Sequence, residues 1–221
     1  LVAYAVALSS MVPSDDSSGL AIHYSLDFRE RDAATNHWVD SAAQMRLPAS
    51  AGHQGFVQGI IALPRAEAAS DWTLGVNQDI TRRGILDESP APLGRGPLEL
   101  SDVVIGDPTQ HLTWLLGQES IVLAPLGAVD RHSTLELFVQ LRSASAEPQL
   151  RTTVRVFRLR DGKPGGKAVI QLATTGAARS GLTPIHRELD VNRLGSGVFQ
   201  LQVEVADAQT HVTRTTLLEV R

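Results

Sequence analysis

The residue types that could do chemistry occur in this sequence without the spacings that the chemistry requires. Seven histidines are spread over 221 residues. No two of them form the His-x-His pair that holds a metal on a strand, or the i, i+4 pair that holds one on a helix. His23 falls on the polar side of an alternating segment, where a solvated side chain is the simpler interpretation. Cysteine is absent, which excludes thiolate metal sites, iron–sulfur clusters and disulfide scaffolds. We predict no metal site.

A calcium loop and a catalytic nucleophile are not indicated either. Asp15 and Asp16 lie in the segment PSDDSSG, which lacks the alternating Asp-x-Asp-x-Asp-Gly ligands and is typical of a turn. The Gly-x-Ser-x-Gly elbow of hydrolases is absent. The glycine-rich segments 162–167 and 195–197 match no phosphate-binding or dinucleotide-binding motif. We expect no catalytic residue, no cofactor and a non-enzymatic protein, although a sandwich can assemble an acid–base pair from distant loops.

The densest charge lies in the segment RTTVRVFRLRDGKPGGK, residues 151–167. On an extended strand Arg155 falls on one face, while Arg158 and Arg160 fall on the other. The interpretation we favour is an edge strand whose charges prevent pairing with other chains. The alternative is a docking face for an acidic partner or for lipid headgroups.

The aromatic residues are few, and three of them are tryptophans. Trp72 begins an alternating apolar run and is expected in a core, whereas Trp38 and Trp114 are candidate exposed anchors. The segment HLTWLLG, residues 111–117, is apolar and fits either a seam between two domains or a contact with another protein, where aromatic anchors are favoured. Candidate partner-binding residues are therefore Trp114, Leu115 and Leu116, supported by Arg155, Arg158 and Arg160.

The elements that must position these residues are strands, because the hydrophobic period is two almost everywhere. Apolar residues alternate with mostly polar ones in the segments 20–29, 135–142 and 199–205. Turn signals separate such runs, including Asp161-Gly162 at a probable hairpin tip. Many short alternating strands with turns between them are typical of antiparallel sandwiches. We predict an all-β protein, and Leu137, Val139, Leu201 and Val203 are predicted core residues.

The boundary between two domains is predicted in the segment DESPAPLGRGP, Asp87 to Pro97, which is rich in proline and glycine and suits a linker. A division after Gly96 gives domains 1–96 and 97–221, each of a size that suits an immunoglobulin-like antiparallel β-sandwich. Each half ends with a strand, a turn and a strand, in the segments 71–86 and 198–220. The predicted architecture is therefore two tandem sandwiches.

The apolar run Leu1 to Ser14 is too short to cross a bilayer. It could be the tail of a signal peptide, but no basic residue precedes it, and the alternation of Val2, Tyr4 and Val6 favours a strand. The formal net charge of -4 argues against a nucleic-acid partner.

Three segments resemble a known family. GRGPLELSDVVIGD, residues 94–107, resembles the Leu-x-Leu-Ser-Asp segment that opens the second β-sandwich of bacterial exported GWxTD-domain proteins. LDVNRLGSGVFQLQVEVAD, residues 189–207, resembles a later family pattern, with Phe199 in place of the usual Tyr, and TTLLEVR, residues 215–221, resembles its closing strand. The Gly-Trp-x-Thr-Asp motif is absent. The resemblance implies two sandwiches and export, and it implies no active site.

These observations predict a non-enzymatic, exported, periplasmic protein that acts through its surfaces. Its partners would be other proteins, as an accessory subunit on the periplasmic side of a membrane-associated complex; a photosynthetic reaction-centre assembly is one conceivable host. No small-molecule ligand is expected. The alternative is a cell-surface carbohydrate-binding module that uses Trp38 or Trp114, and a weaker alternative is an accessory domain of a hydrolase.

Overall fold

The computed structural model describes residues 2–7, 22–31, 38–47, 56–61, 70–76, 79–86, 96–110, 112–144, 149–178 and 181–221. In these ranges the protein is all-β, as the period-two pattern predicts, with a single 3₁₀ turn, η3 (Pro108–Gln110), as the helical element. Among the described residues, no helix is long and apolar enough to cross a membrane. The chain divides into two compact units, Leu1–Ser89 and Pro90–Arg221, and the division falls within the segment Asp87 to Pro97.

The N-terminal unit contains two antiparallel sheets. In one, β1 pairs with β4, and in the other the order is β3-β2-β5-β6. The bounds are β1 (Val2–Ala7), β2 (Ile22–Arg31), β3 (Trp38–Leu47), β4 (Phe56–Ile61), β5 (Ser70–Val76) and β6 (Asp79–Leu86). The run at the start of the chain therefore forms the predicted strand. The side chains of Trp38 and Trp72 and the segment PSDDSSG lie outside the described residues.

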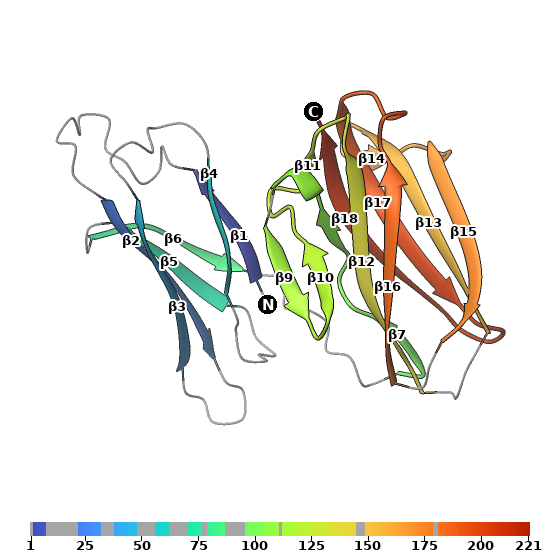
Figure 1. Ribbon diagram of the computed structural model, residues 1–221, viewed down its shortest axis with the longest axis horizontal. Coiled ribbons are helices and arrows are strands. Elements are labelled where there is room, and N and C mark those ends of the chain that lie inside the picture. Colours follow the sequence, from blue (N-terminus) through green and yellow to red (C-terminus); the bar gives the residue numbers. More distant parts are fainter. Residues whose placement is uncertain are drawn as a thin grey trace. The chain divides into compact units, whose positions relative to one another are not determined.

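The C-terminal unit contains two facing sheets and a separate two-stranded hairpin (Figure 1). One of the facing sheets has the order β16-β12-β7, with β8 also on β12, and the other the order β11-β18-β17-β13, with β14 and β15 both paired to β13. The bounds are β7 (Leu98–Leu100), β8 (Val104–Gly106), β11 (Ala128–Val129), β12 (Thr134–Ser143), β13 (Gln149–Arg160), β14 (Lys163–Pro164), β15 (Ile170–Ala177), β16 (Gly181–Asp190), β17 (Gly197–Ala206) and β18 (His211–Val220). We refer to these as the β12 sheet and the β13 sheet. Two sheets with inward-facing apolar residues make a β-sandwich.

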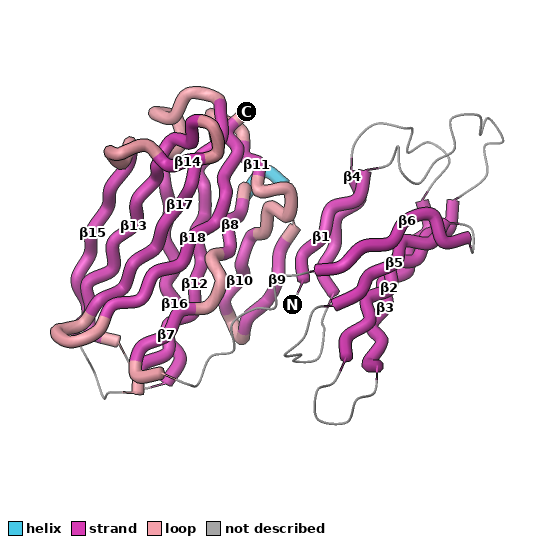
Figure 2. Tube along the Cα trace, turned by 180° about the vertical axis from the view of Figure 1, so that it is seen from behind, coloured by secondary structure: helices cyan, strands magenta, loops and turns pink. Residues whose placement is uncertain are grey.

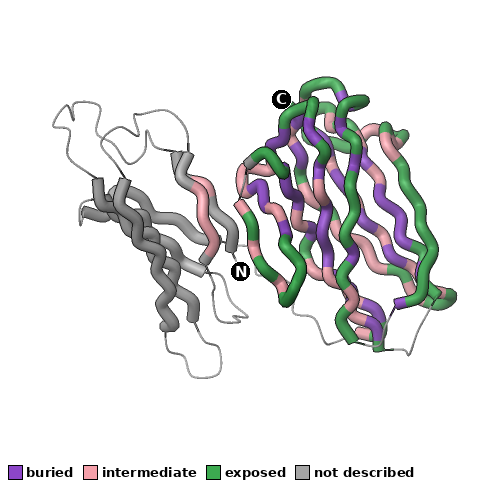
Figure 3. The backbone as a smooth tube through the Cα atoms, in the orientation of Figure 1, coloured by how far each residue is buried: buried purple, intermediate pink, exposed green. Residues whose placement is uncertain are grey.

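The core of this sandwich lies between the inner faces of the two sheets (Figure 3). Leu137 and Val139 of β12 and Leu201 and Val203 of β17 are all 0% exposed. These four residues are therefore core residues, as their place in the alternation predicts. Because residues paired across antiparallel strands project to the same face, the remaining phase of each strand marks the outer face of its sheet.

Two turn features confirm local predictions. Arg160 pairs with Lys163 across the turn formed by Asp161 and Gly162, which have φ values of 52° and 74°. Positive φ at both central positions defines the type I′ turn that Asp-Gly favours, because glycine bears no Cβ and aspartate tolerates this conformation. The segments predicted to end each half, as strand, turn and strand, form β5–β6 and β17–β18.

The interpretation of the arginine-rich segment as an edge strand is wrong. β13 pairs with β17 on one side and with β15 on the other, so it is an inner strand of its sheet. Sequence alternation reports the faces of a strand but not its neighbours, because strand order depends on pairings between distant segments. On the side of β13 away from β17, the edge of this sheet is β15, which carries no charged residue.

Candidate functional site

An apolar hairpin, formed by β9 (Thr113–Leu116) and β10 (Glu119–Val122), carries the first group of predicted partner-binding residues. Its register pairs Trp114 with Ile121 and Leu115 with Ser120. Gly117, with φ of 63°, occupies the first position of the two-residue turn, as expected for a type II′ hairpin turn. Leu123 N donates to Leu112 O at 2.8 Å and extends the ribbon by one further bond.

This hairpin lies beside β8 of the β12 sheet (Figure 2). Gly106 of β8 pairs with Glu136, so a side chain at residue 106 would project to the outer face of that sheet. A Cβ placed there would collide with the carbonyl oxygen of Val122. Ala124 N also donates to Ile105 O at 2.9 Å. The hairpin is therefore held against β8 by backbone contacts.

Buried polar contacts fix the chain between β8 and the hairpin. Asp107 is 2% exposed, and its Oδ1 accepts bonds from Thr109 N at 2.9 Å and Thr109 Oγ1 at 2.6 Å. Its Oδ2 accepts a longer bond from Asp130 N at 3.4 Å. Because these partners satisfy both carboxylate oxygens, the side chain stabilises a turn and has no need of a bound ligand.

The two faces of the hairpin differ in exposure. Trp114 and Leu116 lie on the same face as Ile121 and are half-buried, whereas Ile121 is 2% exposed. Leu115 projects to the other face and is 70% exposed. Trp114 is therefore partly covered, and Leu115 is the apolar side chain that the hairpin leaves open to solvent.

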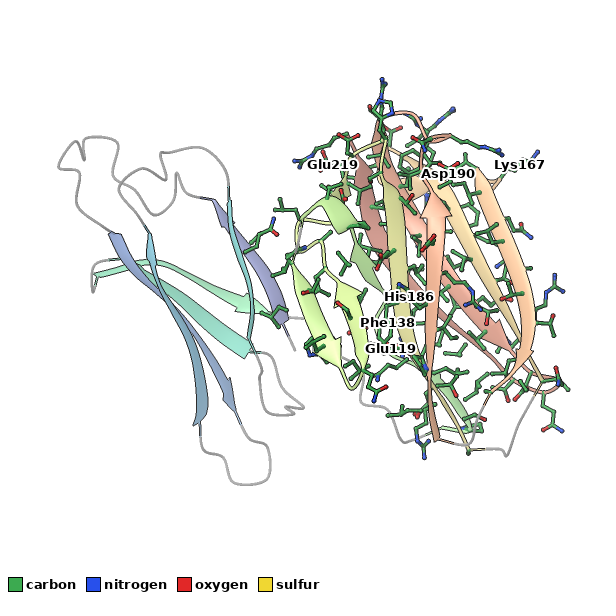
Figure 4. The ribbon with its side chains drawn as sticks, in the orientation of Figure 1. Glu119, Phe138, Lys167, His186, Asp190 and Glu219 are labelled. Carbon is green, nitrogen blue, oxygen red and sulfur yellow. The ribbon has the colours of Figure 1, made fainter. Side chains whose placement is uncertain are left out.

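Sequence analysis missed a buried aromatic cluster on the outward-facing phase of β12. Phe138 stands in the outward-facing phase of β12, paired with Val104 and His186, yet it is only 4% exposed. The His186 ring meets the Phe138 ring edge-on, with centroids 6.5 Å apart (Figure 4). His186 Nε2 lies 3.2 Å from Glu136 Oε2. An aromatic residue in the polar phase of an alternating strand was the available signal that this position is buried.

The three predicted arginines lie on the β13 sheet or at its end. Arg155 projects from the outer face of that sheet, where its Nη1 donates to Glu204 Oε2 at 2.7 Å. Arg158 projects to the opposite side, and its guanidinium carbon lies 5.4 Å from the centroid of the buried Phe199 ring. Its Nη2 donates to Ser196 O at 2.8 Å. Arg158 therefore closes the end of the sandwich over a core aromatic residue, by a cation–π contact.

The six predicted partner-binding residues do not form one continuous surface. The hairpin lies beside β8 of the β12 sheet, whereas Arg155 projects from the outer face of the β13 sheet, away from the core. Arg160 is exposed beside the β13–β14 turn. Figure 1 shows β9 and β13 on different sides of the unit. A partner that binds the hairpin would not reach Arg155 at the same time.

A cleft lies at the edge of the sandwich where β15 and β16 face each other. This cleft measures about 190 Å³ and is lined by Leu150, Thr174, Gly176, Ile185 and Arg187, among others. Arg187 Nη2 lies 3.4 Å from Thr174 Oγ1 and so bridges the two sheets across the cleft. Its Nη1 donates to His186 O at 2.7 Å.

The acidic groups with perturbed pKa values belong to turns and strand ends. The backbone N–H of Asn192 donates to Asp190 at 2.9 Å, and this bond is the main cause of the lowered pKa of Asp190, with the Asn192 side chain second. The bond from Arg221 lowers the pKa of Glu219. No group of three or more potential metal ligands occurs among the residues that the structure describes.

Comparisons with known proteins do not identify a family for this chain. No protein-family model matches the sequence, and no curated protein matches it significantly. Among solved structures, the C-terminal domain of Wzt is similar over 60% of this chain and 78% of the other, with 11% identity and a TM-score of 0.41. A likeness at this level says nothing about what the chain binds.

Proposed function

We propose that this protein is a non-enzymatic interaction protein that docks on a protein partner through the β9–β10 hairpin. The observation that carries the proposal is the 70% exposure of Leu115 on a hairpin whose opposite face carries Ile121, which is 2% exposed. Solitary exposed leucines are common on protein surfaces. This one stands on a hairpin that backbone bonds already hold in place, so a partner that covers Leu115 would bury an apolar side chain on a fixed support.

The energetics favour the hairpin over the arginines as the docking element. An exposed ion pair contributes about 0–1 kcal/mol, and Arg155 already has Glu204 as its partner. Full burial of an exposed leucine side chain contributes about 1.5–3 kcal/mol. Since the hairpin is fixed to its sheet by backbone contacts, docking would cost little ordering entropy.

The partner that we propose is a protein of a larger, membrane-associated complex, with this chain as an accessory subunit on its periplasmic side. The support for export is the resemblance of the LELSD segment, residues 98–102, to exported GWxTD-domain proteins. In the fold this segment joins β7 to β12, because Ser101 N donates to Gln140 O at 2.9 Å and Ser101 Oγ accepts from Gln140 N at 2.8 Å. The segment therefore supports the sandwich.

The carbohydrate-binding alternative is less well supported. Modules of that kind use exposed aromatic rings as stacking surfaces. Among the residues whose side chains the structure describes, Trp114 and Phe157 are half-buried, and Phe138 and Phe199 are buried. The side chain of Trp38 lies outside the described residues.

The test is co-purification of the full chain from its native cells, followed by mass spectrometry. We expect Leu115→Ser to lose the partner while its melting temperature stays unchanged, because an exposed side chain contributes little to folding. The matched control is Leu217→Ser, which removes a leucine that is 62% exposed on the outer face of the β13 sheet. If both variants retain the same partners as the wild type, docking through the hairpin is wrong.

A further inference from the structure

The two strands at the open edge of the sandwich are protected to very different degrees. β16, the edge of the β12 sheet, carries Pro184 together with Arg187, Glu188 and Asp190. Proline and charge are the devices that keep edge strands from pairing with other chains. β15, the edge of the β13 sheet, has the sequence IQLATTGA, with neither charge nor proline over eight residues. Only one of these two neighbouring edges is therefore protected against strand addition.

β15 is also open along most of its length (Figure 3). Every residue from Gln171 to Ala177 is exposed, and within the described part of the chain β15 pairs with β13 alone. Its threonines are β-branched residues that suit an extended backbone. The outer edge of β15 therefore offers backbone donors and acceptors in the arrangement that an added strand needs.

The side chains of β15 suggest which strand would fit. Leu172 pairs with the core residue Val154 and so faces inward, yet it is 44% exposed. Gly176 pairs with Leu150 and projects to the same inner side, at the cleft between β15 and β16. Apart from its chain neighbours, no atom lies within 4 Å of the position that a Cβ of residue 176 would occupy. One strand thus carries an uncovered leucine and, four residues further on, an empty space.

In an antiparallel pair of two β15 strands, the exposed Leu172 of one copy can fill the open space at Gly176 of the other. Paired residues of antiparallel strands project to the same face, so a two-fold axis perpendicular to the sheet requires one residue to pair with its own copy. When that residue is Thr174, Leu172 of each copy stands opposite Gly176 of the other. Each leucine then projects over the other copy's cleft, towards Leu150 and Ile185.

We propose that the protein forms a symmetric dimer in which β15 pairs antiparallel with β15 of a second copy, with Thr174 opposite Thr174. The β13 sheets of both copies then become one continuous sheet, and each exposed Leu172 is covered. This contact uses a different face from the β9–β10 hairpin, so the dimer does not depend on the proposed docking. One pair of edge strands buries less surface than a standard interface, so we expect an equilibrium that depends on protein concentration.

Disulfide trapping tests both the contact and its register, because the chain contains no cysteine. In Thr174→Cys the two thiols lie directly opposite each other, with Cβ atoms about 4.5–5.5 Å apart, close to the spacing of a disulfide. We expect it to form a covalent dimer on the order of tenfold or more faster than Leu182→Cys. That control places a thiol on β16, at a residue that is 56% exposed. Equal rates for the two variants would overturn the proposal, and faster trapping at residue 173 or 175 would overturn the register.

Sedimentation velocity supplies a second readout without engineered thiols. The wild type should shift from monomer to dimer as its concentration rises. Ala173→Lys, which adds a charge to the exposed outer face of the edge, should remain monomeric with an unchanged melting temperature. Thr215→Lys, an exposed strand position on β18 of the same sheet, is the matched control and should dimerise like the wild type. A wild type that stays monomeric throughout, or an Ala173→Lys variant that still dimerises, would show that β15 is not the interface.

Discussion

The absence of a side chain at Gly106 allows the backbone of the β9–β10 hairpin to contact β8. The hairpin backbone at Val122 occupies the space where any side chain at residue 106 would begin. No unusual dihedral angle requires glycine at this position, since Gly106 is not among the residues with positive φ. The requirement comes from close approach of two backbones, which is a contact between distant segments.

We therefore expect Gly106→Ala to displace the hairpin and to lower the free energy of unfolding by about 1–3 kcal/mol, the usual cost of overpacking. Urea denaturation measures this loss. The matched control is Gly166→Ala, where a Cβ meets nothing within 4 Å, and we expect that change to be close to neutral. A wild-type stability for Gly106→Ala would mean that the hairpin moves aside without cost.

The Asp190 carboxylate should make a pH-dependent contribution to stability. Its pKa lies below the ordinary value of 3.8, chiefly because the Asn192 backbone N–H donates to the charged carboxylate. A group whose pKa is lowered by folding stabilises the native state above its unfolded pKa, and that contribution disappears as pH falls through the folded pKa. The stability difference between wild type and Asp190→Ala should therefore be largest near neutrality and shrink towards about pH 2. Denaturation curves at both pH values measure it, and a difference that is the same at both would assign the effect to something other than this carboxylate.

At the level of elements, β12 and β17 supply the inner faces that meet in the core. Leu137 and Leu201 are both 0% exposed, and each belongs to a strand in which every second residue is buried. Truncation at such a position removes contacts and leaves a cavity that the surrounding strands cannot fill.

We expect Leu137→Ala and Leu201→Ala each to lower the free energy of unfolding by about 2–5 kcal/mol, as measured by urea denaturation. The control is Gln140→Ala, on the outer face of the same strand as Leu137, where we expect about 0.5 kcal/mol or less. Costs below 1 kcal/mol at both leucines would contradict the burial of these side chains.

Features of these elements that depend on neighbouring residues could be predicted from the sequence, whereas features that depend on contacts between distant segments could not. The alternation in β12 and β17 gave the strands and their buried faces correctly, and Asp161-Gly162 gave its hairpin, because both signals are local. The position of β13 inside its sheet could not be read from its own residues, and its arginines suggested the opposite. The exposure of Trp114 could not be predicted from local sequence either, because the covered side of a strand depends on which distant segments pack against it. Phe138, an aromatic residue in the polar phase of β12, was the one local sign that an outward-facing position is covered.

At the scale of the whole molecule, the C-terminal unit has the properties of an independent domain. The buried cluster that the structure describes is drawn entirely from strands and turns between Leu98 and Val220. The strands that pair within this unit all belong to the range Pro90–Arg221. A segment with its own core and complete sheets can fold alone.

We therefore expect a fragment from Pro90 to Arg221 to fold by itself, with a β-type circular dichroism spectrum and a single cooperative unfolding transition. The Leu137→Ala cost should be the same in the fragment as in the corresponding transition of the full chain, because the side chains around Leu137 are all retained. A fragment that unfolds gradually, or one in which Leu137→Ala costs much less, would show that residues before Pro90 complete the core. The fragment also retains β15 and all its neighbours, so it should dimerise with the same concentration dependence as the full chain. If it folds but stays monomeric while the full chain dimerises, the dimer contact lies in the N-terminal unit.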